Sequence, residues 1–308
     1  MKISPALDEK TVCEYVGDVD AILGFRITRR IIESAPKLRF IQALGTGVDG
    51  IDLDAAFERG VMVCNSVGEN AVEVSEHAMA LMLALAKNLH KYQRNLASGN
   101  VQRLRQLMLK GKTLGIIGLG SVGMEVAKRV RPLGMRVIAI RRHPQDDLKE
   151  KFGLEFLGGP GDFDYILRES DFLLLSAVLT KETKGMIGER QLSLMKDGAY
   201  LINIARGGLV DETALSAALR RGKLAGAALD VFQLEPITPD NPLIGLENVI
   251  LTPHVAGGAW PPQATPKRVE FIVSNIIKAL TGGKPDNVVD PVLGYAHTSF
   301  SRVLDSSN

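Results

Sequence analysis

Short apolar runs recur along the chain, separated by stretches in which apolar residues repeat every three or four positions. The first pattern predicts buried β-strands and the second predicts helices, such as residues 212–219 and 267–280. Strands that alternate with helices are typical of a doubly wound parallel sheet, so we expect an α/β protein. The predicted strands are residues 21–24, 38–43, 61–64, 114–117, 136–140, 172–175, 200–204, 225–229 and 249–251.

A long helix is predicted from Ala71 to about His90, with Asn70 as its N-cap. Apolar residues occupy nearly all of its sides, so we expect it to be buried between two domains. His77 lies within this helix, where we expect a packed core histidine rather than a catalytic one. Residues 95–112 are polar and basic, which indicates a surface connection.

A G-x-G-x-x-G motif follows the predicted strand 114–117 and opens a helical pattern. Gly118 is suited to a tight turn, Gly120 to close approach of a pyrophosphate, and Gly123 to close packing of helix on strand. The helix N-terminus offers free N–H groups to phosphate oxygens. We therefore predict dinucleotide binding, and the alternative is a glycine turn selected for packing alone.

The predicted strand 136–140 ends in a pair of arginines, Arg141 and Arg142. An acidic residue at this position accepts hydrogen bonds from the ribose hydroxyls of NAD, and none is available here. Two guanidinium groups match a 2′-phosphate instead, so NADP(H) is favoured and NAD(H) remains possible. Two solvated loop arginines are the alternative.

A second glycine turn, Leu44-Gly45-Thr46-Gly47, follows the predicted strand 38–43. Ligands bind at the carboxyl ends of strands in open α/β sheets, and consecutive free amides there suit an anion. A tight connection without a ligand is an equally good interpretation of this turn alone.

Three polar residues follow late predicted strands: Arg206, Glu235 and His254. Reduction of a 2-oxo acid requires a proton donor, which His254 can be near neutral pH. Glu235 can orient the imidazole and favour its protonated form, and Arg206 offers a fork that matches a carboxylate. Taken singly, Arg206 could form a structural ion pair, Glu235 could be a surface charge, and His254 could be a turn residue. The position of all three after strands of one predicted sheet favours an active site.

Composition limits the partners of the chain. A length of 308 residues suggests about two domains, and a net charge of +2 gives no argument for a nucleic-acid partner. No apolar stretch reaches the ~18 residues of a membrane helix, so no membrane partner is expected. Cys13 and Cys64 lack metal or redox spacing, which predicts free thiols in the cytoplasm and no metal site.

Together these motifs resemble the D-isomer-specific 2-hydroxyacid dehydrogenases from about residue 20 to residue 290. The resemblance rests on segments 45–49, 74–77, 111–123, 203–211, 226–236 and 252–254. It implies a Rossmann coenzyme domain at 89–283, a smaller flavodoxin-like substrate domain from 1–88 and 284–308, and a homodimer. The double arginine is similar to the glyoxylate/hydroxypyruvate reductase branch that prefers NADPH.

The resemblance also implies roles for individual residues. Arg206, Glu235 and His254 would be catalytic, with Arg206 and His254 contacting the substrate beside the turn Leu44–Gly47. Asp230 would contact the nicotinamide carboxamide. Further implied cofactor contacts are Ser121, Val122, Ala177, Val178, Thr183, Ile204 and Ala205, together with Gly118, Gly120, Gly123, Arg141 and Arg142.

Four features depart from the family pattern. The chain begins about one βα unit late, which predicts a smaller domain that lacks its first strand or starts unusually. Val178 stands where the family usually has proline, and residues 99–106 lack a tryptophan often found there. Trp260 is predicted either to line the substrate cleft or to cap the next helix.

The expected activity is NAD(P)H-dependent reduction of a small 2-oxo acid, such as glyoxylate or hydroxypyruvate, to the D-2-hydroxy acid. A lactate or phosphoglycerate dehydrogenase is an alternative, the latter less favoured because no regulatory domain is expected after residue 287. A formate-type enzyme is disfavoured because it needs no Glu–His proton relay. From another class, a nucleotide-sensing protein similar to the C-terminal-binding corepressors would use the same scaffold.

Overall fold

The computed structural model describes residues 8–258 and 266–290, so Trp260 lies outside the described residues. Contacts divide the chain into a smaller unit, residues 1–70 with 259–308, and a larger unit, residues 71–258. The domain boundaries expected from the sequence lay between residues 88 and 89 and between residues 283 and 284. The difference arises because helix α4 (Ala71–Ala86) packs on the larger unit's sheet, whereas α11 (Pro266–Leu280) packs on the smaller unit's sheet.

The larger unit is built on one parallel sheet in the strand order β10-β9-β8-β7-β4-β5-β6. The order reverses at β4, which is the doubly wound arrangement of a Rossmann domain. These strands are buried on both faces, as near-continuous apolar runs predict. The strands are β4 (Thr113–Ile117), β5 (Arg136–Ile140), β6 (Phe156–Gly158), β7 (Phe172–Leu175), β8 (Ala199–Asn203), β9 (Leu224–Leu229) and β10 (Val249–Leu251).

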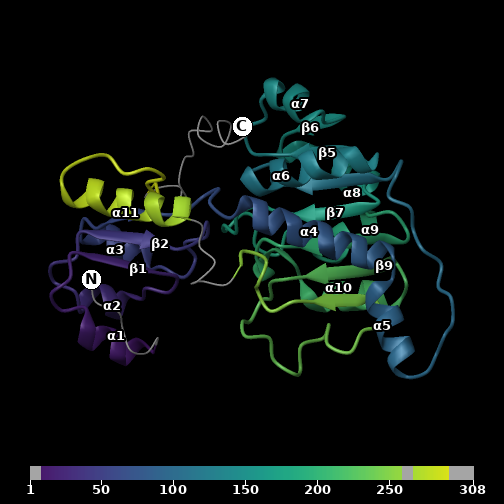
Figure 1. Cartoon of the computed structure of the whole chain (residues 1–308), viewed down its shortest axis with the longest axis horizontal. Coiled ribbons are helices and arrows are strands. Elements are labelled where there is room, and N and C mark those ends of the chain that lie inside the picture. The colour runs from purple at the N-terminus through teal and green to yellow at the C-terminus, as the bar shows by residue number, and fades with distance from the viewer. Residues whose placement is uncertain (1–7, 259–265, 291–308) are drawn as a thin grey trace. The chain divides into compact units, whose positions relative to one another are not determined.

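Helices cover both faces of this sheet (Figure 1). α4 packs against α6 (Ser121–Val130), β8 and β9, whereas α8 (Phe163–Glu169), α9 (Glu189–Leu194) and α10 (Glu212–Arg220) pack in series. The remaining helices of this unit are α5 (Leu89–Ala97) and α7 (Asp146–Phe152), with 3₁₀ turns at Arg131–Leu133, Pro160–Asp162 and Gly207–Leu209.

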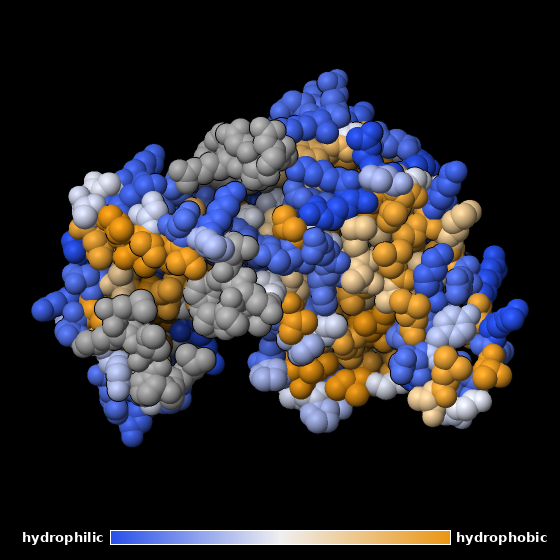
Figure 2. Space-filling model, in the orientation of Figure 1, coloured by the Kyte–Doolittle hydropathy of each residue, from blue (hydrophilic) through white to orange (hydrophobic). Residues whose placement is uncertain are grey.

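The connection from α4 to β4 carries exposed apolar side chains. Leu89 and Leu96 on α5 are 56% and 60% exposed, and Val101 and Met108 beyond it are 79% and 66% exposed. Figure 2 shows hydrophobic surface over the side on which α4 and α5 lie. Apolar patches of this kind mark interaction surfaces more often than ordinary solvated faces.

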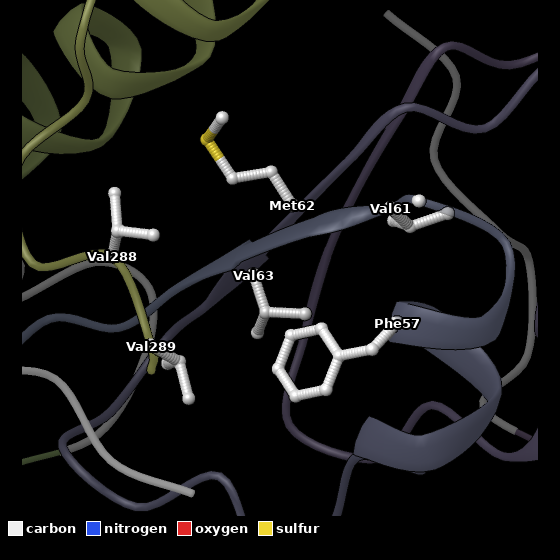
Figure 3. Close-up of a pocket in the computed structure, with 7 residues that line it drawn as sticks. Phe57, Val61, Met62, Val63, Val288 and Val289 are labelled. Atoms are coloured by element: carbon white, nitrogen blue, oxygen red, sulfur yellow. The ribbon is translucent and has the colours of Figure 1, made fainter. Parts of the chain in front are cut away.

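The described part of the smaller unit has a parallel three-stranded sheet, β1 (Ala21–Gly24), β2 (Phe40–Ala43) and β3 (Met62–Cys64), in that order. Helices α1 (Glu9–Tyr15), α2 (Arg29–Glu33), α3 (Leu53–Glu58) and α11 accompany it. A pocket along β3 is lined only by apolar groups, among them Phe57, Val63 and Val289 (Figure 3). It therefore provides no group for catalysis.

Most predicted elements agree with the structure to within two residues at each end. The predicted helix 71–90 is wrong in extent: α4 ends at Ala86 and α5 begins at Leu89, because Asn88 adopts a left-handed φ of 54°. The short strand β6 and helix α1 were not predicted. No helix of the described residues is long and apolar enough to cross a membrane.

Candidate active site

The register of the large sheet aligns the last residues of six strands. Ile117 of β4 pairs with Ile140 and Leu175, Leu175 with Asn203, Asn203 with Leu229, and Leu229 with Leu251. Because all these strands are parallel, the segments that follow them emerge along one edge. The predicted cofactor contacts of this unit lie in those segments or in the first turn of α6. The residues predicted to be catalytic, Arg206, Glu235 and His254, lie in the same segments.

The glycine turn after β4 has the geometry that phosphate binding requires. Gly118 has φ +99°, and a Cβ there would lie 2.6 Å from the Ala177 nitrogen. A Cβ at Gly123 would lie 2.7 Å from the Gly118 carbonyl oxygen, so helix and strand pack closely. A Cβ at Gly120 would meet nothing within 4 Å, so this glycine leaves open space beside the N-terminus of α6.

The pattern of close packing and open space fits a bound dinucleotide. Close packing of the protein's own backbone requires glycine at positions 118 and 123, but it does not explain Gly120. The first turn of α6, with Ser121 and Val122, presents backbone amides and the positive end of the helix dipole toward that space. The residues present are therefore suited to hold a pyrophosphate there.

Arg141 and Arg142 follow β5 directly. The Arg141 amide donates to the Gly158 carbonyl of β6 (3.1 Å), which anchors the start of this segment. Burial lowers the pKa of the half-buried Arg141 guanidinium, an effect that the Asp147 carboxylate opposes. Arg142 is exposed. An anion placed against Arg141 would restore the stabilisation that burial removes from its charge.

The segment after β7 contains Ala177, Val178 and Thr183. The Thr183 hydroxyl donates to the Val178 carbonyl oxygen (2.8 Å) and accepts from the Thr180 amide (2.8 Å). Val178 is 47% exposed. These bonds close the loop around Val178, so a threonine constrains the position where the family usually has proline.

The loop that carries Arg206 is held by side-chain bonds and close backbone packing. The Asn203 side chain accepts from the Ala205 amide (3.1 Å) and donates to the Arg206 carbonyl oxygen (2.9 Å). A Cβ at Gly207 would lie 1.8 Å from the Phe232 carbonyl carbon, so only glycine permits this approach. The loop after β8, which contains Ile204 and Ala205, therefore meets the loop after β9.

Glu235 and His254 form a direct pair. Glu235 Oε2 lies 2.6 Å from His254 Nδ1, and Oε1 accepts from the Phe232 amide (3.0 Å). The hydrogen bond that His254 donates to Glu235 outweighs the effect of burial and raises the pKa of His254. Burial is the largest single effect on Glu235 and favours its neutral form, but the hydrogen bonds from His254 and Phe232 and the nearby positive charges together outweigh it and lower its pKa. The pair therefore favours an imidazolium beside a carboxylate.

Arg206 acts electrostatically on both members of this pair. Its positive charge lowers the pKa of Glu235 and opposes protonation of His254. The structure thus brings together the three residues predicted to be catalytic. A cation, a carboxylate and an imidazole whose Nε2 is not used by Glu235 can bind a carboxylate and deliver a proton.

Replacing Glu235 with glutamine is expected to lower the pKa of His254, because the carboxylate's hydrogen bond and charge both raise it. His254 must be protonated to donate a proton, so the alkaline fall of kcat/KM for reduction should move to lower pH. A pH series of initial rates measures this, with Glu235→Asp, which keeps the charge, as control. An unchanged alkaline limb in Glu235→Gln would contradict this role.

Asp230 directly follows β9 and is 1% exposed. Its carboxylate accepts hydrogen bonds from the loop that follows β10. It accepts from the Thr252 hydroxyl (2.6 Å), the Val255 amide (3.0 Å) and the Ala256 amide (2.9 Å). His77, expected to be a packed core residue, contacts Thr252 and has a side chain 22% exposed. The contact of His77 with Thr252 was not foreseen, because periodicity does not reveal which side chains meet across 175 residues.

The glycine turn 45–47 belongs to the smaller unit, and three successive carbonyl oxygens at this turn accept hydrogen bonds. Leu44 O accepts from Arg268 (2.6 Å), Gly45 O from the Ser66 amide (3.0 Å), and Thr46 O from Asn65 (2.7 Å). In a trans peptide the next N–H points away from the carbonyl. The amides of residues 45–47 therefore face away from these donors, and they donate to no group among the described residues.

This turn is a candidate anion site, as consecutive unpaired amides in a turn bind carboxylates. Sequence reasoning missed three residues that shape it, because they come from other segments: Asn65 and Ser66 follow β3, and Arg268 lies on α11, over 200 residues later. Among the described residues no group of three or more His, Cys, Asp or Glu side chains could hold a metal ion.

Comparison with known proteins identifies relatives along the chain. Residues 79–256 match the profile of the D-isomer specific 2-hydroxyacid dehydrogenase, NAD binding domain. D-3-phosphoglycerate dehydrogenase of Archaeoglobus fulgidus is 42% identical over 84% of this chain, but the chain spans about half (48%) of that relative. Glyoxylate reductase of Korarchaeum cryptofilum is 37% identical over 92% of this chain and 86% of its own length.

The crystal structure of a glyoxylate reductase from Paecilomyes thermophila has the same architecture. It superposes with a TM-score of 0.80 at 30% identity, covering 91% of this chain and 88% of that one. The relatives at 42% and 37% identity carry different substrate names, so identity does not select a substrate. The profile match, the identities and the Rossmann order of the sheet agree, and the chain belongs to the D-isomer-specific 2-hydroxyacid dehydrogenase family of oxidoreductases, with an NAD-binding domain at residues 79–256.

Proposed function

We propose that this protein reduces a small 2-oxo acid, with glyoxylate or hydroxypyruvate favoured, to the D-2-hydroxy acid, using NADPH in preference to NADH. The observation that carries the proposal is the Glu235–His254 pair under the charge of Arg206, at the strand ends that also hold the glycine turn. A nucleotide-sensing corepressor-like role would not require this pair.

Each residue has a defined task in the proposed reaction. Arg206 binds the substrate carboxylate and stabilises negative charge that develops on the keto oxygen. His254 delivers a proton to that oxygen from Nε2, and Glu235 stabilises the imidazolium before transfer. Leu44 and the amides of Gly45, Thr46 and Gly47 are assigned to substrate binding, because consecutive free amides suit an anion. A bound reduced nicotinamide supplies the hydride to the keto carbon.

We assign the remaining cofactor contacts to the same strand ends. Gly118, Gly120, Ser121, Val122 and Gly123 hold the pyrophosphate, as the open space at Gly120 supports. Arg141 and Arg142 hold the 2′-phosphate. The nicotinamide end is assigned to Ala177, Val178, Thr183, Ile204, Ala205 and Asp230, which follow β7, β8 and β9.

Exchanging Arg141 for aspartate is expected to shift coenzyme preference from NADPH toward NADH by roughly tenfold or more, because a charged hydrogen bond to phosphate is lost and a repulsive charge is gained. The ratio of kcat/KM for the two coenzymes measures the shift. Lys149→Asp makes the same change of charge on α7, at a residue not assigned to the cofactor, and is expected to leave the ratio unchanged. An unaltered ratio in Arg141→Asp would refute a phosphate contact.

The proposed activity is tested by loss of NADPH or NADH absorbance with a panel of oxo acids. Glyoxylate, hydroxypyruvate, pyruvate and a bulky 2-oxo acid are compared, and oxidation of D-3-phosphoglycerate is measured in the reverse direction. The last substrate is included because a relative named for it is 42% identical to this chain. Turnover of glyoxylate or hydroxypyruvate above the others supports the proposal, and no turnover of any substrate overturns it.

We further propose a homodimer formed through residues 89–108 and a cytoplasmic location. Leu89, Leu96, Val101 and Met108 offer the apolar area that a dimer contact buries. Cys13 and Cys64 are free thiols, as in a reducing compartment. Sedimentation of Leu96→Glu against the unaltered chain tests the dimer contact.

A further inference from the structure

The loop carrying His254 is anchored to a partly buried chain of hydrogen bonds that begins at His77 on α4. His77 Nε2 lies 3.0 Å from Thr252 Oγ1, and Thr252 Oγ1 lies 2.6 Å from Asp230 Oδ1. His77 Nε2 also lies 3.5 Å from the same carboxylate oxygen. Three segments, α4, the end of β9 and the loop after β10, therefore meet at one buried carboxylate.

The direction of each hydrogen bond follows from its chemistry. An ionised carboxylate only accepts, so the one proton of the Thr252 hydroxyl is used toward Asp230. Thr252 Oγ1 must then accept from His77, which requires a proton on His77 Nε2. The chain runs from His77 through Thr252 to Asp230, and in a buried setting successive bonds of one direction strengthen one another.

This chain acts on a loop whose backbone is strained at the reacting residue. His254 has φ +53°, a left-handed conformation that is uncommon for residues other than glycine. Its amide donates to the Asp230 carbonyl oxygen (2.8 Å), and the next two amides donate to the Asp230 carboxylate. A strained conformation persists only where its surroundings determine it fully. The hydrogen bonds to Asp230 hold His254 in this conformation.

We propose that His77 is a positioning residue for His254: by donating to Thr252 it holds the loop 252–256 in the conformation that presents the His254 imidazole to Glu235 and to the substrate. His77 itself does not touch the reacting atoms. The inference rests on the proposed function in taking His254 as the proton donor. A histidine packed for volume alone would have no reason to be oriented toward the Thr252 hydroxyl.

The first test replaces His77 with leucine, which removes the donor, and with glutamine, which keeps a side-chain N–H. The pKa of His254 is read from the histidine ring signals in NMR spectra of the full chain, which has five histidines. We expect His77→Leu to lower this pKa, because the Glu235–His254 bond is less fully formed, and His77→Gln to preserve it. This measurement needs no substrate, so its outcome is independent of whether the proposed activity is correct.

The second test is kinetic. We expect His77→Leu to lower kcat roughly tenfold to a hundredfold, since small displacements of a reacting group are costly, with little change in the Kd of NADPH. Thr252→Val should give a similar loss, Thr252→Ser should recover most of it, and the double variant should lose little more than either single variant. The pair Thr252→Val and Thr252→Ser keeps the test available if His77→Leu folds poorly.

Three results would overturn the proposal. The first is an unchanged His254 pKa in folded His77→Leu, and the second is an equal loss of kcat in His77→Leu and His77→Gln. Additive effects of the His77 and Thr252 substitutions would also contradict a single chain of bonds.

Discussion

Exchange of His254 for asparagine lowers kcat/KM for the 2-oxo acid about 10²–10⁴-fold, the range typical for loss of a general acid. Asparagine is the suitable replacement because it tolerates the left-handed φ of +53° at this position. The variant therefore removes the proton donor while retaining the loop held by Asp230. Steady-state rates with saturating coenzyme measure the loss.

The control for this variant is coenzyme affinity, measured by quenching of NADPH fluorescence. It should stay within about twofold, because the glycine turn and Arg141 are unchanged. The alkaline fall of the residual rate should also disappear, since the group that titrates is gone. A variant that retains more than a tenth of the activity would exclude His254 as the proton donor.

Exchange of Arg206 for alanine is expected to lower kcat/KM about 10²–10³-fold, as when an oxyanion-stabilising donor is removed. The loss should appear in both KM and kcat, because in the proposed reaction the guanidinium contacts both the substrate carboxylate and the developing oxyanion. Arg206→Lys restores the charge without the planar fork and should recover only part of the rate. Rates across a range of oxo acid concentrations separate the two contributions.

A second measurement distinguishes the electrostatic effect of Arg206 on His254 from a general disturbance of the folded structure. The charge of Arg206 opposes protonation of His254, so its removal is expected to raise the pKa of His254. The alkaline limb of the remaining activity should then move to higher pH, opposite to the shift expected for Glu235→Gln. Equal loss of coenzyme binding and turnover would count against a role in the reaction.

The candidate site was predictable where local chemistry and strand order are sufficient. Parallel strands place their carboxyl ends together, so Arg206, Glu235 and His254 could be grouped from their positions after consecutive strands. The bond between Glu235 and His254 follows from the two loops meeting at Gly207, where close packing admits no side chain. That approach is a property of the folded backbone.

The hydrogen bonds that hold the site residues in place were not predictable in the same way. His77, Asp230 and Thr252 are separated by up to 175 residues and meet only when α4 packs beside β9. Arg268 reaches Leu44 across 224 residues. Side-chain periodicity identifies a buried face, but it contains no information on which distant face it contacts.

The sequence by itself determined the α/β class, nearly all strands of the large sheet, and the glycine turn, because these depend on local periodicity and turn geometry. It also supplied the residue types of the proposed reaction, because these depend on intrinsic chemistry. The tertiary structure decided where the two units divide, the break between α4 and α5, and the contacts that hold His254 in its left-handed conformation. These depend on packing between segments distant in the chain, where small differences in burial and hydrogen bonding outweigh local preference.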